Sequence, residues 1–279
     1  MNELPYILSA ATALAAAFVG RAYGRRLHAR GFTLSAHISV NECPLIPLSL
    51  LLFVLLQVCA STLLRNPQIG WILPLPVEYY ITPAMWALKL FFVVFAMASV
   101  AAVAVLQAYP RRAAILLFTI AAALAVEGLN RWAVQPGLGQ IEERWRDGVI
   151  IQTNPSTCAA ASAANIARQF GIEKTEAEMV DLLNTTWAGT SPAQIVYGLR
   201  SLGLMAEKVQ HPDRDLSKVR APAILLVDAG GEPDAHAVAY MGRRGPLYEI
   251  WDPNPGRTIL PLAAIQERWR GRAIEVRAE

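Results

Sequence analysis

Four residues in the second half of the chain have side chains suited to nucleophilic catalysis. Cys158 is a candidate nucleophile, His236 a candidate base, Asp252 a carboxylate that could orient the base, and Gln152 a donor to a developing oxyanion. Each residue alone is more often a core or turn residue than a catalytic one. Together, in the chain order Cys, His, Asp, they predict a thiol-dependent site that acts on a carbonyl group.

The segment around Cys158 predicts the start of a helix. A short strand is expected over residues 149–152, and Asn154 followed by Pro155 is typical of a helix cap and the first helical position. Small residues, mostly alanine, then continue toward Gly171 and would let neighbouring strands pack closely. Cys158 falls in the first turn, where free backbone N–H groups and the helix dipole stabilise a thiolate.

A predicted hairpin relates His236 to Asp252. Two strand patterns flank the turn Arg243-Arg244-Gly245. If the hairpin is centred on Arg244, counting outward along both strands pairs His236 with Asp252. Opposed residues of antiparallel strands share one face, with Cβ atoms about 4.5–5.5 Å apart. The count therefore predicts a hydrogen bond that orients the imidazole, whereas a slip of one residue would separate the two side chains.

The rest of the second half predicts an α+β domain of ordinary size that begins near residue 149. Two further helices are expected over residues 174–184, capped by Thr175 with Glu178 in a capping box, and over 191–202. Alternating patterns then predict strands over residues 205–209, 223–227, 235–241, 247–251 and 273–276.

The first half is far more apolar than the second. Four runs approach the roughly 17–25 residues that a membrane-spanning helix needs, namely residues 4–20, 46–64, 84–108 and 113–129. Buried core helices are the alternative, but the runs show almost no polar stripe. The expected organisation is a helical membrane anchor over residues 1–130, a linker over 131–148 and the α+β domain over 149–279.

Positive charge predicts the orientation of that anchor. Arg-rich loops stay on the cytoplasmic side, and the relevant residues are Arg21, Arg25, Arg26, Arg30, Arg111 and Arg112. The chain is therefore expected to be an integral protein of a bacterial inner membrane, with the lipid bilayer as a partner and the second domain outside the cytoplasm. The formal net charge of +3 argues against a nucleic-acid partner.

The other cysteines and histidines offer little chemistry. Cys43 and Cys59 are expected to be apolar helix residues, and Cys158, alone in its region, has no partner there for a disulfide. His211 is expected in a surface loop. Neither a metal nor an organic cofactor is implied.

Several short motifs around the four candidate residues are similar to those of one enzyme family. Gln152 precedes Cys158 by six residues, and the other matching segments are Gly189-Thr190-Ser191, Leu202-Gly203-Leu204-Met205-Ala206, Pro222, Asp234-Ala235-His236-Ala237-Val238, Ile250-Trp251-Asp252-Pro253 with Gly256, and Trp269-Arg270-Gly271. This stretch, residues 149–276, resembles the bacteriocin-processing cysteine peptidases, papain-like domains that remove double-glycine leaders. The resemblance implies a thiol protease with Cys158, His236, Asp252 and Gln152 in its site and a peptide or protein as substrate.

The chain departs from that family at two positions and in its architecture. Thr157 and Ala159 flank the cysteine where the family usually has Asp and Gly, which bears on the substrate. No Gly-x-x-x-x-Gly-Lys-Ser/Thr loop occurs, so an exporter is not expected, and a transporter partner remains undefined. Two other functions stay open: a membrane-bound peptide-binding or sensor module with negligible cleavage, and acyl transfer or deamidation by the same residues.

Overall fold

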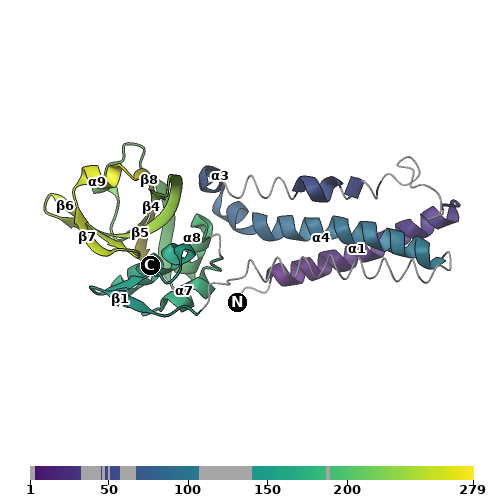
Figure 1. Ribbon diagram of the computed structural model, residues 1–279, viewed down its shortest axis with the longest axis horizontal. Helices are drawn as coiled ribbons and strands as arrows, with labels where there is room; N and C mark the ends of the chain where they lie inside the picture. Colours follow the sequence, from purple (N-terminus) through teal and green to yellow (C-terminus); the bar gives the residue numbers. More distant parts are fainter. Residues whose placement is uncertain are drawn as a thin grey trace. The chain divides into compact units, whose positions relative to one another are not determined.

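The computed structural model describes residues 4–32, 45, 48–49, 51–56, 67–106, 140–186 and 189–279. The chain divides into two compact units. The first comprises Met1–Ile69 and Pro76–Arg131, and the second comprises Gly70–Leu75 and Trp132–Glu279. Figure 1 shows the elements of each.

Two long helices pack against each other in the first unit. They are α1 (Leu4–Ala29) and α4 (Leu75–Leu106), and a short helix, α3 (Pro67–Ile72), precedes α4. Gly20 and Gly24 of α1 lie against α4: a Cβ added to Gly20 would come within 2.5 Å of the carbonyl oxygen of Phe95, and one added to Gly24 would collide with the backbone of Ser99. The two glycines therefore allow the helix backbones to approach closely.

The expected membrane anchor is wrong. Among the described helices, none is long and apolar enough to cross a membrane. Arg21, Arg25 and Arg26, expected in a loop, lie within α1 and interrupt its apolar run, while α4 carries Glu78 and Lys89 along its length. The expected spans 46–64 and 113–129 lie partly or wholly outside the described residues. The assignment as an integral inner-membrane protein with an extracytoplasmic domain is corrected accordingly, and the expected lipid partner has no support.

The second unit is an α+β domain built on an antiparallel sheet. Six strands lie in the order β3-β8-β4-β5-β6-β7, and β1 and β2 form a separate pair. The strands are β1 (Arg144–Arg146), β2 (Val149–Ile151), β3 (Leu204–Gln210), β4 (Ala223–Ala229), β5 (Glu232–Arg244), β6 (Leu247–Asp252), β7 (Gly256–Leu260) and β8 (Trp269–Ala278). The sequence predicted neither β1 nor β7.

Three helices of this unit begin at or close to the predicted positions, whereas another was not predicted. The three are α6 (Cys158–Gln169), α7 (Glu176–Leu182) and α8 (Pro192–Ser201), and the other is the short α9 (Leu262–Gln266), with 3₁₀ turns at Pro155–Thr157 and Leu216–Lys218. Thr175 and Glu178 form the predicted capping box of α7, and Ser191 with Gln194 forms another before α8. In Figure 1, α7 and α8 lie together on one side of this unit, and β5, β6 and β7 curve along another.

Helix α6 is buried almost completely between the other elements. Its alanines, from Ala159 to Ala164, are at most 3% exposed and belong to a core cluster that includes Ala237 and Ala239 of β5. Small side chains are needed here because the helix backbone must approach the sheet closely. The prediction that small residues allow this packing is confirmed. The close packing places Cys158, the first residue of α6, beside the sheet.

The β5–β6 hairpin has a different register from the predicted one. Arg244 pairs with Leu247, so the turn residues are Gly245 and Pro246, and a bulge at Met241 inserts one extra residue into β5. The ladder then pairs Ala239 with Trp251. The predicted direct pairing of His236 with Asp252 is therefore wrong by two positions. Because the shift is even, the two side chains still share one face of the sheet.

Candidate active site

Cys158 is the first residue of α6, at the end of a tightly bonded turn. Asn154 caps the 3₁₀ turn with its side chain, accepting from Ser156 N at 3.0 Å, and the Thr157 hydroxyl donates to the Asn154 carbonyl at 2.7 Å. Pro155 occupies the first position, as predicted. Thr157 is fully buried, so the residue that departs from the family pattern serves this turn. Cys158 is 9% exposed and is a free thiol.

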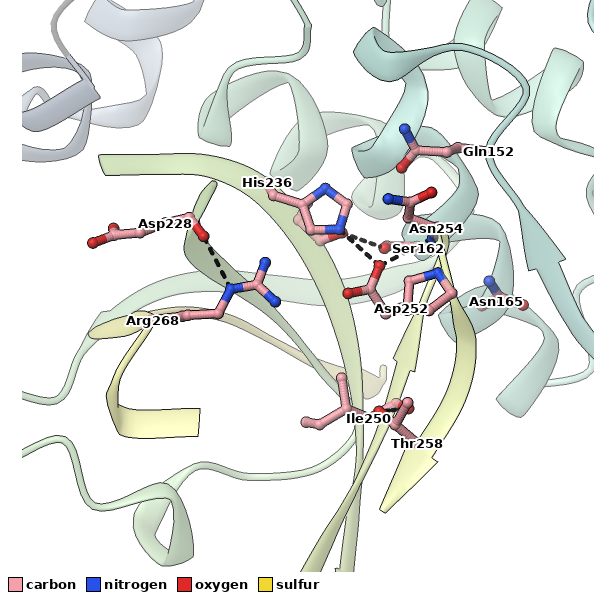
Figure 2. Close-up of polar contacts among 12 residues, drawn as sticks. Gln152, Ser162, Asn165, Asp228, His236, Ile250, Asp252, Asn254, Thr258 and Arg268 are labelled. Atoms are coloured by element: carbon pink, nitrogen blue, oxygen red, sulfur yellow. Dashed lines mark hydrogen bonds and ion pairs between the residues drawn. The ribbon is translucent and has the colours of Figure 1, made fainter. Parts of the chain in front are cut away.

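His236 and Asp252 are in direct contact, as Figure 2 shows. His236 lies on β5, and its Nε2 is 2.8 Å from Oδ1 of Asp252 at the end of β6. The same oxygen accepts from the backbone N of Asn254 at 3.0 Å, which fixes the carboxylate against its own turn. Both side chains are about nine-tenths buried. The contact uses Nε2, which leaves Nδ1 for a second partner.

Cys158 is the other side chain that acts on this imidazole. Interactions with the Cys158 thiol and with Asp252 both favour the protonated ring. Burial by itself lowers the pKa of His236, but the two partners outweigh it and raise the pKa from 6.5 to about 9. The imidazole is therefore protonated at neutral pH, and its positive charge lies between a sulfur and a carboxylate.

Gln152 lies in the loop between β2 and the turn that precedes Cys158. Its backbone N donates to the Pro253 carbonyl at 2.7 Å, which ties the loop to the residue after Asp252. Nε2 donates to the Asn154 carbonyl at 3.1 Å. A side-chain amide carries two N–H donors, so one remains for another acceptor. Its Oε1 is buried and has no hydrogen-bond partner among the described residues.

Two buried polar residues of α6 were not singled out in the sequence. Ser162 donates to the Ala237 carbonyl at 3.0 Å, next to His236. Asn165 accepts from Ile150 N at 2.9 Å and donates to Ile150 O at 3.0 Å. They follow Cys158 by four and seven residues and so lie on one face of the helix. That spacing within an alanine run was the signal that could have identified them.

The face of α6 that carries Cys158, Ser162 and Asn165 thus links the parts of the site. Cys158 acts on His236. Ser162 is bonded to the strand that carries His236, and Asn165 is bonded to the strand that leads to Gln152. The arrangement brings a thiol, an imidazole and a side-chain amide onto linked elements, and acyl chemistry at a carbonyl uses groups of these kinds.

Other residues considered in the sequence lie elsewhere. Asp234 pairs with Arg272 and has no described contact with His236. The His211 side chain is mostly buried rather than exposed, and its Nε2 is 3.2 Å from Glu275 Oε1. Cys43 and Cys59 lie outside the described residues. In the described part of the chain, no cluster of three or more His, Cys, Asp or Glu residues forms a metal site.

Comparisons with known proteins match this unit. The model of the Peptidase C39 family matches residues 146–279. An uncharacterized protein of Methanothermobacter thermautotrophicus is 31% identical over 128 residues, which cover 46% of this chain and 87% of that protein.

Two solved structures are also similar. The first is a double glycine motif protease from an AMS/PCAT transporter in complex with the leader peptide (20% identity, TM-score 0.43), which covers 50% of this chain and 95% of that one. The second is the peptidase domain of Streptococcus ComA, a bi-functional ABC transporter (23% identity, TM-score 0.42), covering 46% of this chain and 96% of that one. From the family match and the archaeal relative, we conclude that the chain, through residues 146–279, belongs to the Peptidase C39 family.

Proposed function

We propose that this protein is a cysteine peptidase that hydrolyses peptide bonds through Cys158, His236 and Asp252, with Gln152 as an oxyanion donor. The observation that carries the proposal is the 2.8 Å contact between His236 and Asp252, supported by the effect of the Cys158 thiol on the pKa of the same imidazole. A protonated His236 between Cys158 and Asp252 favours a thiolate nucleophile that is ready before substrate binds.

The reaction proceeds in two halves. The Cys158 thiolate attacks the carbonyl carbon, and the oxyanion that forms accepts hydrogen bonds from the Gln152 side chain and the backbone N–H of Cys158. His236 then donates its proton to the leaving amine as the C–N bond breaks, leaving a thioester on Cys158. In the second half, His236 takes a proton from water, the resulting hydroxide attacks the thioester, and the thiolate and imidazolium are restored.

Asp252 acts through His236. Its carboxylate accepts a hydrogen bond from the Nε2–H group, which turns Nδ1 toward the sulfur and stabilises the charged ring. The turn bond from Asn254 keeps the carboxylate in place during both halves of the reaction.

The substrate is a peptide or protein, and the sequence motifs suggest a first choice of probe. Because they resemble those of peptidases that cleave after two glycines, we propose a peptide with Gly-Gly before the scissile bond. A mixture of peptides from a whole-proteome digest serves as the unbiased alternative, since Thr157 and Ala159 depart from that family's pattern.

The test is product analysis by mass spectrometry with the full chain in water enriched in oxygen-18. We expect cleavage of at least one peptide, a new carboxylate that carries one oxygen-18 atom, and no cleavage by Cys158→Ala. Cleavage that persists in Cys158→Ala would overturn the proposal. Products joined to an added amine instead of water would show acyl transfer, and unchanged peptides in every assay would show that this chain is not a peptidase.

A further inference from the structure

One buried carboxylate near the site has no part in the chemistry above. Glu176 is the first residue of α7 and is fully buried. Its Oε1 accepts from the backbone N of Thr153 at 2.8 Å, and its Oε2 accepts from the Thr153 hydroxyl at 2.6 Å. Both oxygens of this side chain are therefore bonded to one residue, and that residue directly follows Gln152.

Burying a carboxylate costs free energy unless its oxygens are hydrogen-bonded. Here the bonds that offset the cost all go to the loop between β2 and α6. Glu176 makes no described contact with Cys158, His236 or Asp252. Its effect on the site must therefore pass through the loop residue that it holds.

The loop is held on both sides of Gln152. Before it, Asn165 bonds both backbone groups of Ile150. At Gln152 itself, the backbone N is bonded to the Pro253 carbonyl. Glu176 supplies the anchor on the far side, at Thr153. Glu176 thus holds the one residue between Gln152 and the bonded turn that begins at Asn154, and its loss would leave the backbone N–H of Thr153 without this acceptor.

We propose that Glu176 is a positioning residue that fixes the Gln152 amide for stabilising the oxyanion. The inference rests on the proposed function, because it assigns Glu176 a role in the same reaction. Gln152 acts on an oxyanion that exists only in the transition state and the intermediate. Loss of Glu176 should therefore lower kcat and leave KM nearly unchanged.

A second measurement separates positioning from general damage. Iodoacetamide reacts with a thiolate by displacement at a saturated carbon, so no oxyanion forms and Gln152 has no role. The alkylation rate of Cys158 should therefore be the same in the wild type and in variants of Glu176. A variant with a disordered site would lose both peptide cleavage and alkylation.

The experiment compares three variants in the full chain with a peptide-Gly-Gly-aminomethylcoumarin probe. Glu176→Met keeps the length but removes both acceptors, and we expect kcat to fall about tenfold, as small misplacements of catalytic groups do. Glu176→Gln should restore most of the activity, because its oxygen can accept from Thr153 N. The Thr153 hydroxyl can then donate to the Glu142 carbonyl, 2.8 Å away. Glu178→Met is the matched control: Glu178 caps the same helix but is exposed and has no contact with the loop.

A double-mutant cycle with Gln152→Ala decides the inference. If Glu176 acts only through Gln152, adding Glu176→Met to Gln152→Ala should change kcat by less than about twofold. A further tenfold fall in the double variant, or a parallel fall in the alkylation rate, would overturn the positioning role. If Glu176→Met does not fold, Thr153→Val is used instead, because it removes one of the two hydrogen bonds. The fall in kcat caused by Thr153→Val should be smaller, and it should disappear when Gln152→Ala is also present.

The two proposals fail in different ways. Wild-type protein that cleaves neither this probe nor any digest peptide refutes the proposed function, and the positioning role with it. Wild-type turnover that depends on Cys158, combined with additive losses in the cycle, refutes the role of Glu176 alone.

Discussion

His236 and Asp252 meet diagonally across two strands rather than directly opposite each other. The two strands pair Ala239 with Trp251. Continuing this pairing by one residue places Asp252 opposite Val238, which is two residues from His236. The side chains nevertheless lie 2.8 Å apart between Nε2 and Oδ1. Diagonal neighbours on one face remain within reach of long side chains. The contact therefore depends on an even offset in the register, which the bulge at Met241 produces.

We expect substitutions of the proposed triad to have graded effects. Cys158→Ala and His236→Ala should abolish peptide cleavage, and Asp252→Asn should lower kcat by about 10³- to 10⁴-fold, by comparison with the equivalent change in a serine protease triad. Asp234→Asn is the control, since Asp234 is bonded to Arg272 and not to His236. Steady-state kinetics measure these effects. A silent Asp252→Asn beside an inactive Asp234→Asn would reverse the assignment of the orienting carboxylate.

Gln152→Ala should lower kcat roughly 100- to 1,000-fold, as loss of one oxyanion donor does. The expected KM is nearly unchanged, because the donor is needed only when charge develops on the carbonyl oxygen. Single-turnover measurements of acylation check this. Equal losses in kcat and in the alkylation of Cys158 would mean that Gln152 supports the fold of the site instead.

Cys158 should react quickly with iodoacetamide near neutral pH. The protonated His236 stabilises a neighbouring thiolate, and the helix N-terminus adds to that effect. His236→Ala should slow the reaction, whereas Gln152→Ala should not. The measurement is the alkylation rate followed by mass. A rate equal to that of a free thiol and insensitive to His236→Ala would contradict an ion pair.

The pH dependence of cleavage should have its alkaline limit near pH 9. His236 must carry a proton to donate to the leaving amine, and its pKa is raised to about 9. Asp252→Asn removes one of the two interactions that raise this pKa, so the residual activity should decline at lower pH. Profiles of kcat for the two proteins test the shift. An identical alkaline limit in both proteins would show that the protonation of His236 does not set that limit.

The same pKa predicts how stability varies with pH. Because the pKa of His236 in the folded protein, about 9, exceeds its usual value of 6.5, the folded state binds the proton more tightly. The resulting stabilisation is complete below pH 6.5 and is lost as the pH rises through about 9. Urea unfolding of wild type and His236→Ala at several pH values measures this difference, which should shrink across that window. A difference that grows with pH would contradict it.

Local signals in the sequence were sufficient for three helices of the second unit, α6, α7 and α8, but not for α9. Asn154, Pro155 and Thr175 mark starts that the structure reproduces within a residue or two, because a cap depends on only a few neighbouring residues. The sequence also predicted that His236 and Asp252 would be in contact, and that contact is present; the chemistry assigned to them and to Cys158 stays a prediction.

Features that depend on distant parts of the chain were not predictable in this way. The bulge at Met241 and strand β7 depend on which strands pair, and no local pattern determines pairing. Glu176 looked like an ordinary acidic residue in a first helical turn, and its burial depends on Thr153. In the first half, high apolar content predicted membrane spans, but the helix that contains the first run continues through Arg21, Arg25 and Arg26.

The order of the site residues along the chain has a consequence for biosynthesis. Cys158 opens α6, whereas the imidazole that we propose activates it arrives only with β5, and the carboxylate with β6. Under the proposed function, the thiol is made first and lacks its partners until those strands have formed. A newly made chain would then not cut itself or its neighbours at that stage. Activity would begin only when the last strands are in place, which would make completion of the fold the step that switches the protein on.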